Sequence, residues 1–192
     1  MSVDLGAPTV ELARLVAGVS EDQLAGPTPC AETTVSAMLA HLHGLAVAFR
    51  DAAGKVEGPT TSTPPDAAAA VLVDDWSTAI PKVLTELAVA WRQPDAWTGM
   101  TKAGGVELPG EVGGLVANNE LVVHGWDLAV ATGQSYAVAP ANLAASWEMV
   151  SQTPDEPEAR QGLFGPVVPV PEDAPLLDRV LGGAGRDPGW TA

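Results

Sequence analysis

The stretch ELVVHGWD, residues 120–127, is the most informative part of the chain. Glu120 and His124 are four residues apart and share one face of an α-helix, and Asp127 falls within about 60° of both. The surrounding residues 115–131 are strongly apolar, which is typical of a buried helix. A carboxylate in such a helix is costly unless it is paired or bound to a cation. A divalent metal would satisfy the carboxylate and the imidazole together.

Three further amphipathic patterns accompany this segment, with turn-rich connections between them, and together they predict a four-helix bundle. Pro81 lies inside the third pattern and is expected to kink that helix. Residues 93–110 are expected to be irregular or briefly extended. The four helices are expected to begin at Pro8, after a cap at Thr33 or Thr34, at Pro65 and at about Glu111.

The chain changes character after the fourth helix, which is expected to end at Thr132 with Gly133 as its cap. Pro140 opens a shorter fifth helix. A Pro-rich, extended tail follows it and contains one short helix at residues 175–181. We expect this tail to pack on the bundle rather than to fold alone. The predicted fold class is therefore all-α, a four-helix bundle with a short fifth helix and an irregular C-terminal tail packed on it.

Length and hydrophobic content are consistent with one domain. The chain has 192 residues, of which 46% are hydrophobic, and this is enough for a sizeable core. We expect residues 1–137 to form the bundle. Residues 138–192, the C-terminal helix and the Pro/Gly-rich tail, are expected to belong to the same domain.

The charge balance narrows the classes of partner. Acidic residues number 24 against 9 basic ones, for a net charge of −15. This argues against nucleic acid and against anionic membrane surfaces. A small anionic substrate would need a local positive centre, which a metal could supply. The single cysteine, Cys30, fits a reducing compartment, and we find neither a signal peptide nor an apolar run of membrane-spanning length. The expected location is cytoplasmic.

Three histidines are available as ligands: His41, His43 and His124. His41 and His43 point in nearly opposite directions from the second helix, and periodicity favours His41 only slightly. His41 with Glu120 and His124 would form a His₂Glu set on facing helices. That set leaves open positions for water or substrate, as catalytic zinc sites do.

Each of these residues also has a simpler interpretation. Glu120 and His124 match a short motif that is often a surface pair. His41 alone would be a core or boundary histidine. Asp127 would orient His124 or face water. Cys30, in a turn before a helix, would be a small buried hydrophobe or a reactive thiol.

The motifs also occur in a recognisable order. The chain resembles the DinB/YfiT-like metal-binding four-helix bundle superfamily and, within it, the group related to mycothiol-dependent maleylpyruvate isomerase. The resemblance implies a DinB-like fold and a metal triad of His41, Glu120 and His124, usually with zinc. The isomerase also has a separate C-terminal domain, for which the tail here is expected to be too short. The segments that carry the resemblance are TPC at 28–30, MLAHLHG at 38–44, ELVVHGWDLA at 120–129 and GRDPGW at 185–190.

The expected function follows from the triad and the resemblance. A metal-bound thiolate, of mycothiol by analogy, would add to an electrophilic substrate in a transferase or isomerase reaction. Asp127 is expected to be catalytic, by orienting His124, accepting a proton or binding a polar substrate group. Arg186 is expected to bind an anionic substrate if the tail folds back over the cavity. The partners would be a small thiol and an electrophile, and a homodimer through exposed bundle faces is compatible with the sequence.

Three alternatives stay open at this point. A metal-bound water would make the protein a hydrolase. A metal that serves only binding or stability would make it a non-enzymatic module. A helical protein without metal would leave Glu120 and His124 as a simple pair.

Overall fold

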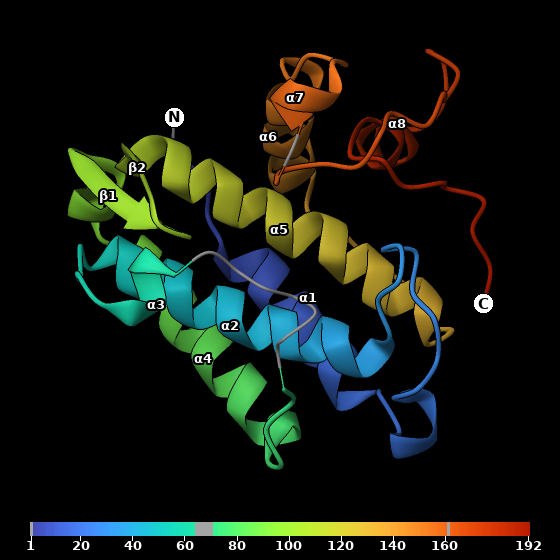
Figure 1. Cartoon of the computed structure of the whole chain (residues 1–192), viewed down its shortest axis with the longest axis horizontal. Coiled ribbons are helices and arrows are strands. Elements are labelled where there is room, and N and C mark those ends of the chain that lie inside the picture. The colour runs from blue at the N-terminus through green and yellow to red at the C-terminus, as the bar shows by residue number, and fades with distance from the viewer. Residues whose placement is uncertain (1, 64–70, 161) are drawn as a thin grey trace.

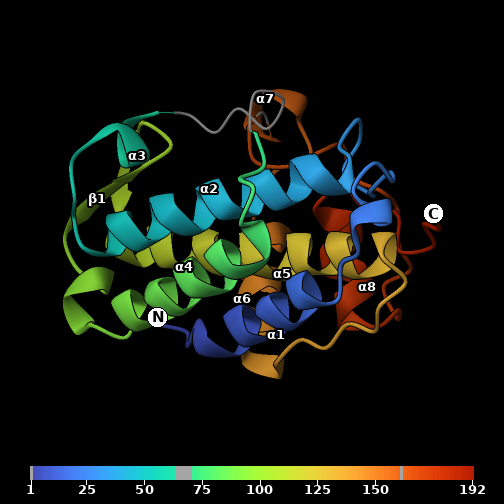
Figure 2. The same ribbon diagram turned by 90° about the horizontal axis from the view of Figure 1, so that it is seen from below.

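Four long helices pack around one core in the computed structural model, which describes residues 2–63, 71–160 and 162–192 (Figure 1). Both α1 and α2 contact α4 and α5, so the four helices enclose a common interior (Figure 2). This arrangement is the all-α bundle that the sequence predicts, and it agrees with the DinB-like fold that the family resemblance implies. The helices span α1 Gly6–Ala17, α2 Val35–Ala53, α4 Trp76–Trp91 and α5 Gly110–Ala131.

The ends of these helices follow from local sequence. The side chain of Thr34 accepts a hydrogen bond from the backbone N–H of Ala37, so Thr34 is the N-cap of α2. At the end of α5, Gly133 adopts a φ of 67°, a conformation that favours glycine and stops the helix. The caps predicted at Thr34 and Gly133 are therefore confirmed.

The interior is built from branched aliphatic side chains on all four helices. Their burial removes apolar surface from water and is the main stabilising contribution to the fold. Helix α5 is buried on nearly every side from Ala117 to Ala129, as its apolar sequence predicts. The largest fully buried side chains of the four helices are those of Leu12, Leu15, Val16, Met38, Leu39, Leu42, Ile80, Leu84, Leu87 and Leu128.

Helix α4 begins later than the sequence suggests. The expected start, Pro65, lies outside the described residues, and residues 71–75 are not helical. The carbonyl of Asp75 accepts the first helical hydrogen bonds, from the N–H groups of Thr78 and Ala79. The side chain of Asp75, the N-cap residue, makes no capping hydrogen bond, so the later start has no side-chain explanation in the structure. Pro81 lies within the helix, and the kink expected there stays a prediction.

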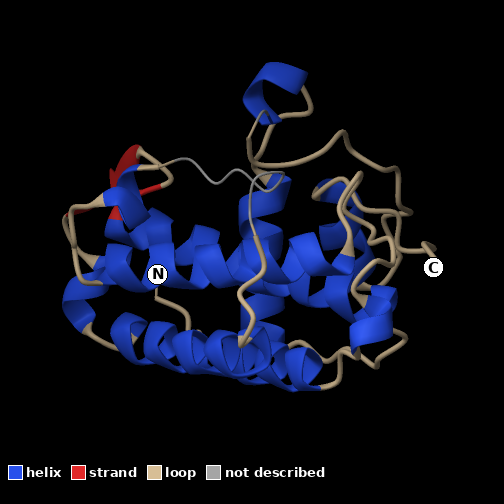
Figure 3. Cartoon of the chain, turned by 60° about the horizontal axis from the view of Figure 1, so that its bottom comes forward, coloured by secondary structure: helices blue, strands red, loops and turns tan. Residues whose placement is uncertain are grey.

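The connection between α4 and α5 forms a short hairpin, the one place where the described residues contain paired strands of a sheet (Figure 3). Strand β1 Met100–Ala103 pairs antiparallel with β2 Val106–Pro109. Gly104 and Gly105, both at positive φ, make the turn between the two strands. Short helical turns that the sequence did not predict are η1 Glu21–Gln23, α3 Pro59–Ser62, η2 Pro94–Trp97 and α7 Pro157–Arg160.

The C-terminal segment packs on the outside of α5. Helix α6 Pro140–Ser151 contacts α5 and α8 Leu176–Gly183. Val123 of α5 belongs to a second apolar cluster together with Val150, Val180 and Ala184. A polar contact reinforces it, because the side-chain amides of Asn118 and Asn142 hydrogen-bond at 2.7 Å. The tail therefore packs against the bundle, as expected.

Within the described ranges, none of the helices combines the length and the hydropathy that a membrane span requires.

Candidate metal centre

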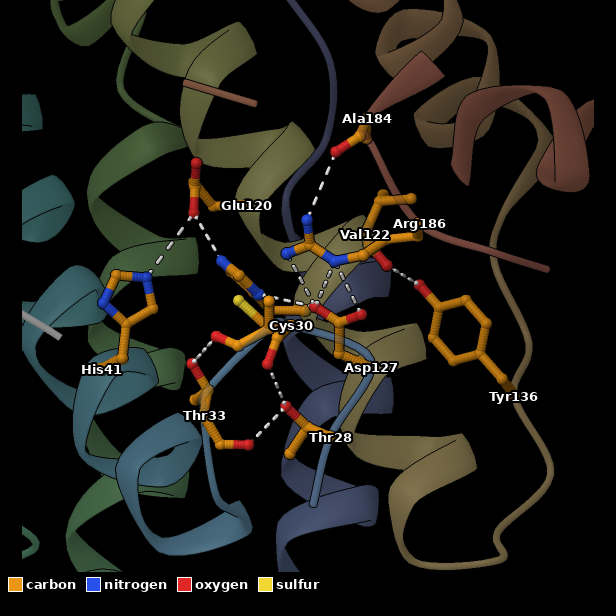
Figure 4. A network of polar contacts seen from close by, with 12 residues as sticks. Thr28, Cys30, Thr33, His41, Glu120, Val122, Asp127, Tyr136, Ala184 and Arg186 are labelled. Carbon is orange, nitrogen blue, oxygen red and sulfur yellow. Dashed lines mark hydrogen bonds and ion pairs between the residues drawn. The ribbon is translucent and has the colours of Figure 1, made fainter. Parts of the chain in front are cut away.

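Three side chains meet between α2 and α5. His41 lies on α2, and Glu120 and His124 lie one turn apart on α5. The side chains of His41 and Glu120 point towards one another (Figure 4). One carboxylate oxygen of Glu120 lies 3.0 Å from Nε2 of His124 and 4.0 Å from Nε2 of His41. One ligand atom from each residue lies within 4.8 Å of the others. The structure thus brings together the three residues proposed as metal ligands.

The donor set suits a divalent transition metal. Two imidazole nitrogens and one carboxylate oxygen are ligands typical of zinc, and three protein ligands leave a position for another molecule. The two rings stand nearly perpendicular, at 88° with 5.0 Å between their centroids, so they do not stack. This is the one such group of three that the described residues form, and His43 is not a member of it.

Asp127 holds the ring of His124 from the other side. Its carboxylate is fully buried, and Oδ2 lies 2.9 Å from Nδ1 of His124. This partner places the proton on Nδ1 and leaves Nε2 directed at Glu120, the arrangement that usually orients a metal-binding histidine. Burial also excludes the interpretation in which Asp127 faces water.

Arg186 reaches the centre from the C-terminal tail. Its Nε lies 3.1 Å and 3.2 Å from the two carboxylate oxygens of Asp127, and its Nη2 lies 3.1 Å from one of them. A further hydrogen bond joins Nη1 to the carbonyl of Ala184. The tail does fold back, and the partner of the guanidinium is Asp127. A contact between Arg186 and a substrate stays a prediction.

Burial and neighbouring charges set the protonation of the centre. Burial, helped by nearby His124, lowers the pKa of His41 to about 4. Burial also opposes the charged form of His124, but its hydrogen bonds and charge interactions with Asp127 and Glu120 outweigh this and raise its pKa to about 10. Burial would raise the pKa of Glu120, yet the contact with His124 holds it below the usual value. In the metal-free protein near neutral pH, His41 is therefore an uncharged donor, and His124 is an imidazolium between two carboxylates.

A loop from the N-terminal half closes one side of the centre (Figure 4). The hydroxyl of Thr28 donates to the carbonyls of Thr33, at 2.9 Å, and Cys30, at 3.2 Å. Cys30 is partly buried and packs against the main core. This contact favours its interpretation as a small hydrophobe.

Sequence reasoning missed two features beside the centre. Tyr136 donates a hydrogen bond of 2.8 Å to the carbonyl of Val122, and its ring covers α5 at Gly125. A cavity of about 500 Å³ opens beside His41 and Glu120, between α2, α5 and the hairpin. A larger cavity of about 650 Å³ lies under the C-terminal tail and contains none of the three candidate ligands. A periodic pattern predicts which residues face inward, but it does not show where packing leaves a space.

Comparison with known proteins identifies one matching family and two relatives of similar length. The family described as mycothiol maleylpyruvate isomerase N-terminal domain matches residues 5–129. Two uncharacterized proteins of Mycobacterium tuberculosis, MT0763 of strain CDC 1551 / Oshkosh and Rv0738 of strain ATCC 25618 / H37Rv, are each 32% identical to this chain over 182 residues. Each match covers 91% of this chain and 91% of the relative.

Two solved structures have a similar fold. The crystal structure of mycothiol-dependent maleylpyruvate isomerase is 20% identical with a TM-score of 0.64, and covers 95% of this chain and 86% of that one. The structure of a mutant of that enzyme is also 20% identical, has a TM-score of 0.66, and covers 93% and 85%. An overlap of this extent continues past residue 129, so the segment after α5 also has structural counterparts there. The expectation that the tail is too short to be the separate C-terminal domain of the isomerase stays a prediction.

Proposed function

The chain belongs to the mycothiol maleylpyruvate isomerase N-terminal domain family, and we therefore propose that its His₂Glu centre binds a divalent metal, most simply zinc. At this centre a thiol of the mycothiol type would react with an electrophilic small molecule. The observation that carries the proposal is the convergence of ligand atoms from His41, Glu120 and His124 to within 4.8 Å of one another.

The surrounding residues fit a metal better than a simple ion pair. A surface pair of Glu120 and His124 would need no third donor, whereas the uncharged imidazole of His41 lies on the facing helix. Asp127 fixes the ring of His124, and Arg186 keeps that carboxylate in place. Such outer contacts are typical of metal-binding histidines. When bound, the cation would supply the charge that converts a thiol into a thiolate.

The reaction that this chemistry supports is addition to a conjugated double bond. The thiolate sulfur forms a bond to one alkene carbon while the π electron pair moves towards the conjugated carbonyl oxygen. Rotation about the new single bond and expulsion of the thiolate give cis–trans isomerisation, with the thiol regenerated. If a proton is added to the neighbouring carbon instead, the thiol stays attached and the reaction is a transfer.

The protein's own residues would position this reaction. His41 and His124 hold their nitrogens towards one point from two helices, and Glu120 lies between them. Asp127 acts through His124 and is therefore a positioning residue in this proposal. Arg186 has the same indirect role, because its hydrogen bonds go to Asp127 and to a backbone carbonyl.

Calorimetric titration of the metal-loaded full chain with mycothiol tests the proposal, with glutathione and bacillithiol in parallel. We expect mycothiol to bind the metal-loaded protein and not the metal-free protein. Glu120→Ala should abolish both metal retention and thiol binding. Glu86→Ala is the matched control, because Glu86 lies on α4 and pairs with Arg50. Full zinc content in the Glu120 variant would contradict the proposed triad, and no thiol binding to zinc-loaded protein would favour a non-enzymatic module.

A further inference from the structure

The cavity beside the centre has a distinctive wall. Its volume is about 500 Å³, a size typical of small-molecule sites. His41 and Glu120 form one end, so a molecule in the cavity would reach the three-residue centre. The remaining wall comes from α2, α3 and its C-cap Thr63, the hairpin, α5 and residues 162–163. Its larger apolar side chains are those of Leu45, Phe49, Val106, Leu108, Val116 and Leu163.

Positive charge is missing from this wall. Among the described lining residues, Glu120 carries the one carboxylate and there is no Lys or Arg. The residues outside the described ranges, Met1, 64–70 and 161, contain no Lys or Arg either. The basic residues on α2, just after α2 and on β1 have other partners. Arg50 pairs with Asp51 and Glu86, Lys55 donates to the carbonyl of Ala96, and Lys102 lies 3.9 Å from Glu107.

This composition determines which molecule fits. Beyond the reach of a metal at the centre, a dicarboxylate would lose its hydration against apolar side chains and meet no guanidinium or ammonium in return. A polyhydroxylated thiol such as mycothiol would also lose hydrogen bonds there, since one of the few lining hydroxyls, that of Thr60, already donates to Asp51. An uncharged, apolar molecule would lose nothing polar and would bury its surface.

We infer that this cavity selects an uncharged, largely apolar electrophile, whose reactive double bond lies beside His41 and Glu120 and whose body packs on the wall lined by Phe49, Val116 and Leu163. This inference rests on the proposed function and specifies its substrate class. It separates the chain from the enzyme named for maleylpyruvate, whose maleyl and pyruvate groups each carry a carboxylate.

A pair of ligands that differ in charge tests the inference. Dimethyl maleate and maleate share one carbon skeleton, and ligand-observed NMR measures their binding to the full chain without thiol. We expect the diester to bind the zinc-loaded protein about tenfold more tightly than maleate. The same preference should persist in the metal-free protein, because the wall supplies it. Equal binding, or tighter binding of maleate in both forms, would overturn the inference.

Lysine substitutions in the wall should reverse the preference. Val116→Lys places an ammonium one turn before Glu120, and Val106→Lys places one at the rim, where the side chain is 64% exposed and folding is not at risk. Both should strengthen maleate binding and weaken diester binding. Val89→Lys is the matched control, since Val89 is exposed on α4 and does not line the cavity. If neither Val116→Lys nor Val106→Lys changes the ratio of the diester and maleate affinities, the ligands bind elsewhere and the inference is wrong.

The two proposals fail separately. If the protein retains no metal but the diester preference is observed and responds to Val106→Lys, the cavity assignment stands and the metal proposal fails. If zinc and mycothiol bind but maleate is preferred, the metal proposal stands and the substrate class is wrong.

Discussion

The carboxylate of Asp127 lies 2.9 Å from Nδ1 of His124, and this contact directs the opposite ring nitrogen towards Glu120. Arg186, in the C-terminal tail, donates hydrogen bonds to the same carboxylate. A line of three side chains thus runs from the end of the chain to the candidate metal centre. The geometry of the centre consequently depends on a residue that belongs to neither ligand-bearing helix.

Asp127→Asn should weaken metal binding without removing a ligand. The amide cannot stabilise the imidazole as a carboxylate does, so we expect a loss of about 10- to 100-fold in zinc affinity. Competition with a chromophoric chelator measures it. Asp187→Asn is the control, because Asp187 is exposed and its carboxylate accepts from the N–H of Gly189. An unchanged affinity in the Asp127 variant would show that the contact does not tune the centre.

Arg186→Gln should destabilise the fold. It leaves the carboxylate of Asp127, which is fully buried, without its guanidinium, and removing one member of a buried pair costs about 3–5 kcal/mol. Urea unfolding of the metal-free protein measures this loss. The double variant with Asp127→Asn should recover part of it, because the buried carboxylate that lost its guanidinium is then also gone. Strictly additive losses would argue against a coupled pair.

Zinc affinity should rise with pH. In the metal-free protein the pKa of His124 is about 10, so this residue must lose a proton before it binds metal, whereas the pKa of His41 is about 4 and it is already unprotonated. Between pH 6 and 9 we expect affinity to increase about tenfold per unit, with about one proton released per ion. Calorimetry in buffers of different ionisation enthalpy counts the protons. Release of two would show that both histidines are protonated.

The same shift makes the stability of the metal-free protein depend on pH. The pKa of His124 in the folded protein, about 10, lies above the value of 6.5 that an unperturbed histidine has. Its contribution to stability is therefore complete below about pH 6.5 and is lost as the pH rises through about 10. Urea midpoints measured across this range should fall with increasing pH. The urea midpoints should fall less in Asp127→Asn, because this variant lacks one of the contacts that raise the pKa of His124.

Removal of the metal should leave the bundle folded. The main core contains aliphatic side chains from all four long helices, and the centre contributes no large apolar contact to it. Circular dichroism after chelation should therefore keep its helical signal, with a melting temperature lowered by the lost binding energy. Unfolding on chelation would instead indicate a structural metal and favour the non-enzymatic alternative.

Two glycine substitutions should have opposite effects on stability. A Cβ at Gly114 would overlap the ring of Trp97 and lie 2.8 Å from that of Trp91, so Gly114→Ala should cost about 1–3 kcal/mol. A Cβ at Gly44 meets nothing within 4 Å on the exposed side of α2, so Gly44→Ala should stabilise by about 0.5–1 kcal/mol. Thermal unfolding compares them. Loss of stability in both would mean that close packing at Gly114 is not the cause.

The sequence predicted the parts of the site that depend on helical spacing. Glu120 and His124 share a face because they are four residues apart, and Asp127 reaches the same histidine because it follows by three. The position of His41 opposite them needed the family resemblance, since periodicity hardly separated it from His43. The bundle was predictable because the helix caps, the helical spacing of apolar residues and the family resemblance all indicated the same four helices.

Contacts between distant segments were not predictable in the same way. The pairing of Arg186 with Asp127 joins residues 59 positions apart through a tail with no periodic pattern. The buried guanidinium of Arg160 is held by the backbone carbonyls of Pro154, Gly165 and Gly183, and carbonyls leave no signature in a sequence. The start of α4 was misplaced because apolar spacing continues upstream of the residues that begin the helix.

The position of Arg186 also has a consequence for the order of events during synthesis. All three candidate ligands and Asp127 leave the ribosome before Arg186, which follows Asp127 by 59 residues. Until Arg186 is synthesised, the carboxylate of Asp127 lies inside the bundle without the guanidinium that pairs with it in the complete fold. We therefore expect the helices to associate first and the centre to reach its final geometry last, when translation has delivered the C-terminal arginine.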